Sequence, residues 1–256
     1  MTHLTGNAPT GTPTWLDLRI PDLGEAQRFY GALFGWEFED FGSAAGHYNG
    51  CLLAGRTVAG MMRNPDPDAS EFRWNLHFAS DDCDETVKRA TDAGGTVPMP
   101  PEEILDRGRM AVVADPVGAR FGVWQGRENA GSETVNEPGS LVWSELVTAA
   151  PGPAGEFYAA VFGHRLEPMP AEAEIDYTVL VRPDGRPIGG ILGRPGAASS
   201  SWRSYFEVAD ADEAVLRARA LGGTADEPAD TPYGRVADVR DPFGAAFRVM
   251  QSVQEG

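Results

Sequence analysis

The segment "DPVGARFGVWQG" at residues 115–126 returns, little changed, as "DPFGAAFRVMQS" at residues 241–252. In each copy the order Asp-Pro-x-Gly places proline second and glycine fourth in a tight turn, which suits a type I geometry. Such a turn joins two antiparallel strands. The repeated segment therefore predicts a β-hairpin that serves the fold, and it is not a catalytic motif.

The repeat extends over nearly the whole chain. "WLDLRIPDLGEAQRFYGALFGW" at residues 15–36 is echoed by "WSELVTAAPGPAGEFYAAVFGH" at residues 143–164. "WNLHFASDDCDETVKRATDAGG" at residues 74–95 is echoed at the same spacing by "WRSYFEVADADEAVLRARALGG" at residues 202–223. Self-similarity at one fixed spacing is the sequence signature of a duplicated structural unit. We therefore expect two tandem copies of one domain.

Within a copy, the hydrophobic period changes in a regular order. Residues 14–20 alternate as a half-buried strand, and residues 23–34 have helical spacing that stops at Gly35. Short strands follow around residues 36–41, 48–54 and 57–62. The same order starts again with the strand "FRWNLHFAS", the helix "CDETVKRATDAGG" and three further strands. The pattern predicts a βαβββ module twice per copy.

Length and composition suit this organisation. The 256 residues are enough for two domains that each bury a core, and 42% hydrophobic residues indicate a globular chain. We expect an amino-terminal tail at residues 1–13, a first domain at 14–126, a linker at 127–139 and a second domain at 140–256. No apolar run approaches the length of a membrane span, and residues 1–14 do not resemble a secretory signal. A soluble, cytoplasmic protein is the expectation.

Charge and cysteine content exclude several functions. The net charge is −17 and Lys88 is the only lysine, so the chain would repel nucleic acid. Cys51 and Cys83 have no counterparts in the second copy, which favours two free thiols. We expect a small-molecule partner and no partnership with nucleic acid or membrane. Two paired domains in a monomer and a homodimer of chains are both compatible with the sequence.

The order and spacing of these modules resemble the vicinal oxygen chelate superfamily, which includes glyoxalase I, extradiol dioxygenases and bleomycin-resistance proteins. The resemblance rests on "FYGALFGW" at the end of the first helix, the central "WNLHFASDDCDETVKRATDAGG" and the closing Asp-Pro-x-Gly hairpin. It implies an α+β fold with two tandem domains, each a cupped mixed sheet built from two βαβββ modules. The chain as a whole resembles the two-domain glyoxalase-like and hydroxylase-like proteins of actinobacteria.

The resemblance also implies where a metal ion would be bound, through His, Gln or Glu on the first, fourth, fifth and eighth strands of each domain. The family's spacing places Trp15, Asn75 and Gly122 there in copy one, and Trp143, Arg203 and Arg248 in copy two. The fourth strands, "TVAGMM" and "RPIGGIL", contain no carboxylate or imidazole. We therefore expect neither a metal nor another cofactor. A register shift of two residues is the alternative, because it would bring Asp17, His77 and Glu145 towards ligand positions.

Strand alternation predicts which side chains face the concave side of each sheet. We expect proton-transfer roles for two pairs, Asp17 with His77 and Glu145 with Tyr205. The expected ligand-binding residues are Trp15, Asn75, Trp124, Trp143, Arg203, Arg248 and Met250. The alternative for each is structural: the tryptophans and His77 would belong to the core. Asp17 would then pair with Asn75 or His77, and Glu145 with Arg203 or Arg248.

Two functions remain open on this basis. The first is a metal-independent protein that binds or sequesters a planar, hydrophobic metabolite or drug against Trp15 or Trp143, as bleomycin-resistance proteins do. The second is a metal-free isomerase, lyase, cyclase or hydroxylase-like enzyme of secondary metabolism. A metal-dependent, glyoxalase-type detoxification is a third reading, which the count of ligands opposes.

Overall fold

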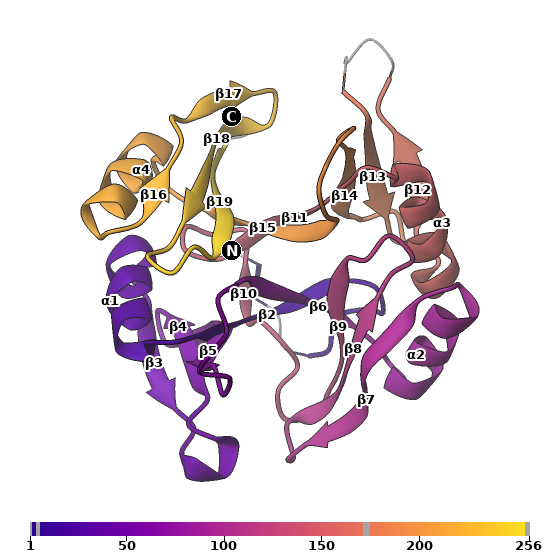
Figure 1. The fold of residues 1–256 in the computed structure, drawn as a ribbon, viewed down its shortest axis with the longest axis horizontal. Coiled ribbons are helices and arrows are strands. Elements are labelled where there is room, and N and C mark those ends of the chain that lie inside the picture. The colour runs from indigo at the N-terminus through magenta and orange to yellow at the C-terminus, as the bar shows by residue number, and fades with distance from the viewer. Residues whose placement is uncertain (1, 4–5, 171–174, 254–256) are drawn as a thin grey trace.

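The computed structural model describes residues 2–3, 6–170 and 175–253 and contains two similar α+β domains (Figure 1). The elements of the first domain are β2 (Pro13–Ile20), α1 (Leu23–Phe34), β3 (Glu37–Asp40), β4 (Asn49–Leu53), β5 (Arg56–Arg63), β6 (Trp74–Ala79), α2 (Cys83–Asp92), β7 (Thr96–Ile104), β8 (Gly108–Ala114) and β9 (Arg120–Gly126). A one-turn 3-10 helix covers Ser43–Ala45. The βαβββ module occurs twice, as the sequence predicts.

The second domain repeats this order. Its elements are β11 (Leu141–Thr148), α3 (Pro151–Phe162), β12 (Arg165–Pro168), β13 (Tyr177–Val181), β14 (Pro187–Gly193), β15 (Ser201–Glu207), α4 (Ala211–Ala220), β16 (Thr224–Ala225), β17 (Ala229–Thr231), β18 (Gly234–Arg240) and β19 (Ala246–Ser252). The one difference is at the edge of the sheet, where β16 and β17 pair with β18 in the place of the single strand β7 on β8. Outside the domains, β1 (Thr2–His3) pairs with β10 (Thr134–Val135), so the expected tail and linker contain a short ribbon.

Each domain has one mixed sheet, in the order β3-β4-β5-β2-β6-β9-β8-β7 in the first and β12-β13-β14-β11-β15-β19-β18-β16 in the second. The central strands β2 and β6 are antiparallel, while β2 pairs with β5 and β6 with β9 in parallel. The two modules of a domain therefore meet at its middle strands. The first strand begins at Pro13, one residue earlier than expected. The cysteines, Cys51 and Cys83, are buried and free.

Alternation along the strands separates two faces. Leu16, Leu18 and Ile20 are fully buried in the core, and the residues between them point to the opposite face of the sheet. Side chains such as Phe78 and Phe206 lie on the core face, whereas their neighbours His77 and Tyr205 lie on the other. We call this other face of the first sheet the first cup and that of the second sheet the second cup.

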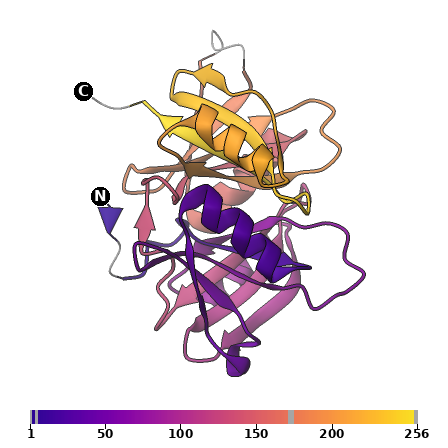
Figure 2. The ribbon, with the colours of Figure 1, turned by 90° about the vertical axis from the view of Figure 1, so that its left-hand side faces the viewer.

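The two domains pack through their core faces, with α1 against α4 and α2 against α3 (Figures 1 and 2). Phe78 lies 5.1 Å from Phe162 and 5.2 Å from Trp202 between ring centroids, and Phe34 lies 4.9 Å from Phe206. One continuous apolar cluster thus runs through both domains. The cups consequently face away from each other. No helix in the described residues is long and apolar enough to cross a membrane.

A chain of three polar groups crosses this interface twice. Trp74 donates its indole N–H to the hydroxyl of Tyr30 (3.1 Å), which donates in turn to the carboxylate of Asp241 in the other domain (3.0 Å). The mirror arrangement runs from Trp202 to Tyr158 (2.8 Å) and on to Asp115 (2.9 Å). The carboxylates belong to the repeated Asp-Pro-x-Gly hairpins.

Each hairpin is organised by the same aspartate. Asp115 accepts hydrogen bonds from the backbone N–H groups of Val117 and Ala119 through Oδ1, which leaves Oδ2 for Tyr158. Asp241 bonds Phe243 and Ala245 in the same way. Burial raises the pKa of both carboxyls, although these hydrogen bonds oppose the shift. The hairpin predicted from the sequence therefore also fastens one domain to the other.

The amino-terminal arm is held by an imidazole from the second domain. His164 Nε2 lies 2.9 Å from the carbonyl oxygen of Gly11, and its ring stacks on Phe162. Because the carbonyl only accepts, Nε2 carries the proton, and Nδ1 is buried without a partner. Burial lowers the pKa of His164 to about 4. The folded protein thus holds this side chain neutral.

We predict that Tyr30→Phe and Tyr158→Phe each lower the free energy of unfolding by about 2 kcal/mol, because each leaves a buried carboxylate short of one donor. Urea denaturation measures the loss. Tyr233→Phe serves as the control, since Tyr233 is 61% exposed and its change should stay within about 0.5 kcal/mol. Equal stability of all three variants would show that the hydroxyls do not hold the domains together.

A second prediction concerns the stability of the fold at low pH. Below its ordinary pKa of 6.5 the His164 side chain takes up a proton in the unfolded chain but not in the fold until about pH 4. The free energy of unfolding should therefore fall by about 3 kcal/mol from this group between pH 6.5 and 4. The difference from His164→Gln, measured by urea denaturation across that range, isolates the contribution. Parallel pH profiles of the two proteins would contradict it.

Candidate functional site

A cavity of about 400 Å³ opens on the first cup. Its polar floor comes from the central strands: Asp17 on β2, Asn75 and His77 on β6. Its apolar wall comes from the second module and from the segment before β6: Phe72, Pro98, Met99, Met110 and Val112. The wall is partly held by the second domain, because Phe72 meets Phe243 edge-on at 6.4 Å between ring centroids.

Asp17 is the centre of the polar floor. Its Oδ2 lies 2.7 Å from His77 Nε2, and its Oδ1 accepts a hydrogen bond from the Asn75 amide at 2.7 Å. Burial raises the pKa of Asp17, but the charge of His77 and the two hydrogen bonds outweigh it and hold the pKa below its usual range. Both pairings that strand alternation suggested for Asp17 are therefore present together.

His77 depends on a glycine opposite it on the next strand. His77 pairs with Gly122 in the register of β6 and β9, and a Cβ at residue 122 would lie 1.9 Å from Nδ1. Only glycine leaves room for the ring there. Nδ1 is buried and has no hydrogen-bond partner. The imidazole is therefore oriented by Asp17 through one nitrogen while the other lies beside Gly122, which lines the cavity.

Trp15 is buried beneath the surface of the first cup. It is 5% exposed and donates its indole N–H to the hydroxyl of Tyr48 at 3.0 Å. In the second cup, Trp143 donates in the same way to Tyr177 at 2.8 Å. Sequence reasoning missed both tyrosines. The signal was the glycine in each fourth strand, because a Cβ at Gly60 or Gly190 would collide with the tyrosine hydroxyl.

The second cup is crossed by a charged network. Tyr205 donates to Glu145 Oε2 at 2.8 Å and accepts a hydrogen bond from the Arg248 guanidinium. Arg248 also bonds both oxygens of Asp238, at 2.8 and 2.9 Å, and lies 3.5 Å from Glu145 Oε1. Burial and the charge of Glu145 raise the pKa of Tyr205. Arg248 is thus the cation that neutralises Glu145, one of the two arginines expected for that role.

The two cups have different residues at equivalent positions of their sheets. His77 stands opposite Gly122 in the first domain, and Tyr205 stands opposite Arg248 in the second. Beside them, Val112 pairs with Gly122, and Asp238 pairs with Arg248. Glycine and valine leave space in the first cup, whereas an arginine and its carboxylate partner fill the equivalent place in the second.

The residues of neither cup fit a divalent metal. Asp17, Gly60, His77 and Gly122 occupy the four central strands of the first cup, so two of the four positions offer no side chain. In the second cup the corresponding set includes Arg248, whose positive charge opposes a cation. No group of three or more His, Cys, Asp or Glu side chains suited to a metal occurs in the part of the chain that the structure describes.

The remaining predicted residues lie around these centres. Trp124 is 6% exposed and donates its indole N–H to the carbonyl of Asn129, so the start of the linker covers it. Arg203 lies 3.5 Å from Asp238 and is partly exposed. Met250 is half-buried on β19, where it pairs with Val236. Met99, Met110 and Val112, which form the wall of the first cavity, were not anticipated.

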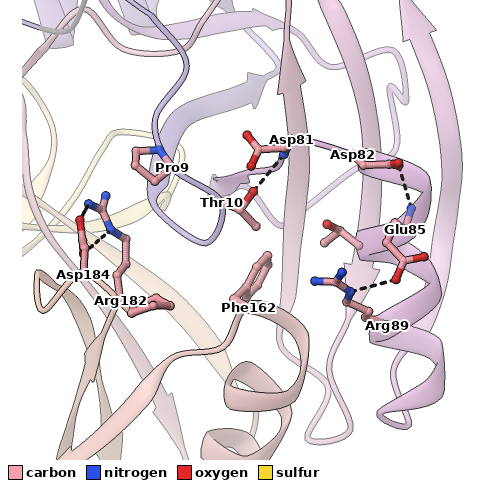
Figure 3. Close-up of a pocket in the computed structure, with 11 residues that line it drawn as sticks. Pro9, Thr10, Asp81, Asp82, Glu85, Arg89, Phe162, Arg182 and Asp184 are labelled. Atoms are coloured by element: carbon pink, nitrogen blue, oxygen red, sulfur yellow. Dashed lines mark hydrogen bonds and ion pairs between the residues drawn. The ribbon is translucent and has the colours of Figure 1, made fainter.

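A larger cavity, of about 520 Å³, lies at the junction of the domains (Figure 3). Its charged side chains are engaged with each other: Arg182 with Asp184, and Arg89 with Glu85 at 3.0 Å. Asp82 caps the first turn of α2 through the N–H of Glu85. This cavity contains none of the predicted site residues. These charged side chains are already paired within their own domains, and the first cup is the stronger candidate site.

Comparison with known proteins agrees with the repeat. A family model described as a glyoxalase-like domain matches residues 15–124 and again 143–250. The "Anthracycline biosynthesis protein DnrV" of Streptomyces peucetius is 39% identical over 270 residues, which cover 99% of this chain and 97% of that protein. The "Putative glyoxylase CFP32" of Mycobacterium tuberculosis is 40% identical over 248 residues, covering 94% of this chain and 95% of the other.

Solved structures share the architecture at low identity. The Mn(II)-bound glyoxalase from Novosphingobium aromaticivorans superposes with a TM-score of 0.66 at 15% identity, covering 96% of this chain and 84% of that one. The 2,3-dioxygenase LapB from Pseudomonas sp. KL28 gives 0.64 at 17% identity, with 97% and 95% covered. These likenesses concern the fold alone. The two family matches and the relatives of equal length show that this chain belongs to the glyoxalase-like family, with two tandem domains of the vicinal oxygen chelate fold.

Proposed function

We propose that this protein binds a planar organic molecule in the first cup without the help of a metal ion. The observation that carries the proposal is the cavity of about 400 Å³, which has an apolar wall and a hydrogen-bonding floor of Asp17, Asn75 and His77. Flat apolar walls with a few convergent polar groups are typical of small-molecule sites. The second cup supports the fold, since Arg248 and its partners cross it.

The relatives support a class of ligand. Streptomyces proteins named for anthracycline biosynthesis are 38% and 39% identical to this chain over nearly their whole length. Anthracyclines contain fused, planar aromatic rings, which a wall of Phe72, Met99 and Met110 suits well. An aromatic secondary metabolite or drug of this shape is therefore our proposed ligand. The core shared by the two domains supports a single chain as the working unit.

Val112→Trp should weaken the binding of an anthracycline by at least about tenfold, because the indole would fill the cavity beside Gly122. Isothermal titration calorimetry measures the dissociation constant. Tyr205→Phe is the matched control in the second cup and should leave it unchanged. Binding that survives Val112→Trp but fails in Tyr205→Phe would move the site to the second domain.

A second candidate function is metal-free proton transfer in the same cup. The specific observation is the pair of Asp17 and His77, joined at 2.7 Å, with Nδ1 of His77 buried and unpartnered beside the cavity. An imidazole oriented by a carboxylate is a common general base near neutral pH. In this candidate function Asp17 fixes the ring, and the imidazole takes a proton from the bound molecule.

For this candidate, the protein should accelerate the exchange of α-hydrogens for deuterium in an enolisable aromatic ketone dissolved in D2O, followed by proton NMR. His77→Gln should reduce the acceleration by at least about a hundredfold, the usual range for general base catalysis, while the ketone still binds. Glu145→Gln should retain the exchange. The same exchange rate in the wild type and in His77→Gln would exclude His77 as the base.

A further inference from the structure

Three arginines stand at one end of the first cup. Arg19 is on β2, Arg73 directly precedes β6 and Arg120 begins β9, and all three line the cavity of about 400 Å³. These strands are neighbours in the sheet. Asp17 stands opposite Asn75 in the register, so Arg19 and Arg73 lie on the same side of the polar floor. The mouth of the cavity therefore carries three guanidinium groups beside one carboxylate, that of Glu71.

Among the described residues, one of these guanidinium groups has an ion-pair partner and two do not, although the charge of Arg19 helps to lower the pKa of Asp17. Arg73 pairs with Glu71 at 3.1 Å, and Asp17 is engaged by His77 and Asn75. Arg19 and Arg120 take part in no hydrogen bond or ion pair with the described residues. The mouth of the first cup thus has two arginines that form no ion pair with the described residues.

The duplicated domain provides an internal comparison. At the positions of Arg19, Arg73 and Arg120, the second copy has Val147, Ser201 and Ala246. The fold itself consequently does not need a cation at any of the three. The arginines occur in the copy whose cup holds the cavity and are absent from the copy whose cup is filled by Arg248. Their presence is best explained by what enters the first cup.

We propose that the ligand of the first cup carries an anionic group, a carboxylate, which docks on Arg19 and Arg120 while its aromatic body lies against Met110 and Val112. This inference rests on the proposed function and narrows its ligand class to aromatic acids. Guanidinium groups match carboxylates through paired N–H donors. On a protein of net charge −17 the local positive potential would also guide an anion to this mouth.

The test compares two probes of the same shape, an anthraquinone carboxylate and the corresponding neutral carboxamide, by isothermal titration calorimetry at low salt. The carboxylate should bind at least about fivefold more tightly, and the preference should shrink as salt is added. Arg19→Gln and Arg120→Gln should each reduce carboxylate binding about threefold and leave carboxamide binding unchanged. Arg28→Gln removes the same charge from the exposed face of α1 and is the matched control.

The outcomes separate the two proposals. Equal affinity for both probes, unaffected by the arginine variants, would overturn the anionic ligand and leave the binding function in place. An equal loss in Arg19→Gln, Arg120→Gln and Arg28→Gln would also overturn it, because only net charge would then matter. Binding of neither probe would overturn the proposed function together with this inference.

Discussion

The structure depends on two buried carboxylates, one from each domain, that bond to the opposite domain. Asp115 and Asp241 fold their own hairpins and then receive a tyrosine hydroxyl from the opposite domain. A buried carboxylate without donors is costly, so neither hairpin reaches its full stability until the partner domain has docked. This requirement directs the two core faces towards each other and leaves both cups facing outward.

The fold could be predicted from the sequence because its signals are local and occur twice. Periodicity predicted the modules, and Gly35 predicted the end of the first helix. The cross-domain bonds could not be predicted in this way. The helical spacing predicts only that Tyr30 is a buried aromatic residue. No residue near it in the chain indicates that it bonds to Asp241. Its role depends on how the domains dock, which sequence spacing does not encode.

The geometry of the candidate site could be predicted from the sequence only where it depends on alternation along a single strand. Alternation placed Asp17 and His77 on the cup face, and a simple charge argument paired them. The spacing taken from the family instead emphasised Trp15 and Asn75, two residues earlier on each strand. In the structure Trp15 is bonded to Tyr48, and the cavity is formed by Met110 and Val112 from the second module. Side chains on strands so distant in the chain meet only through the closure of the sheet.

Duplication separates what the fold needs from what each cup does. Core positions stay the same in both copies, as Tyr30 and Tyr158 or Phe78 and Phe206 show, whereas the cup positions differ. The differences are also coupled: Arg248 requires Asp238, and Gly122 accompanies Val112. Replacing Arg248 alone would remove the cation that lies 3.5 Å from the buried carboxylate of Glu145, which is unfavourable. Several residues together therefore occupy the centre of the second cup, whereas Gly122 of the first leaves room for the ring of His77.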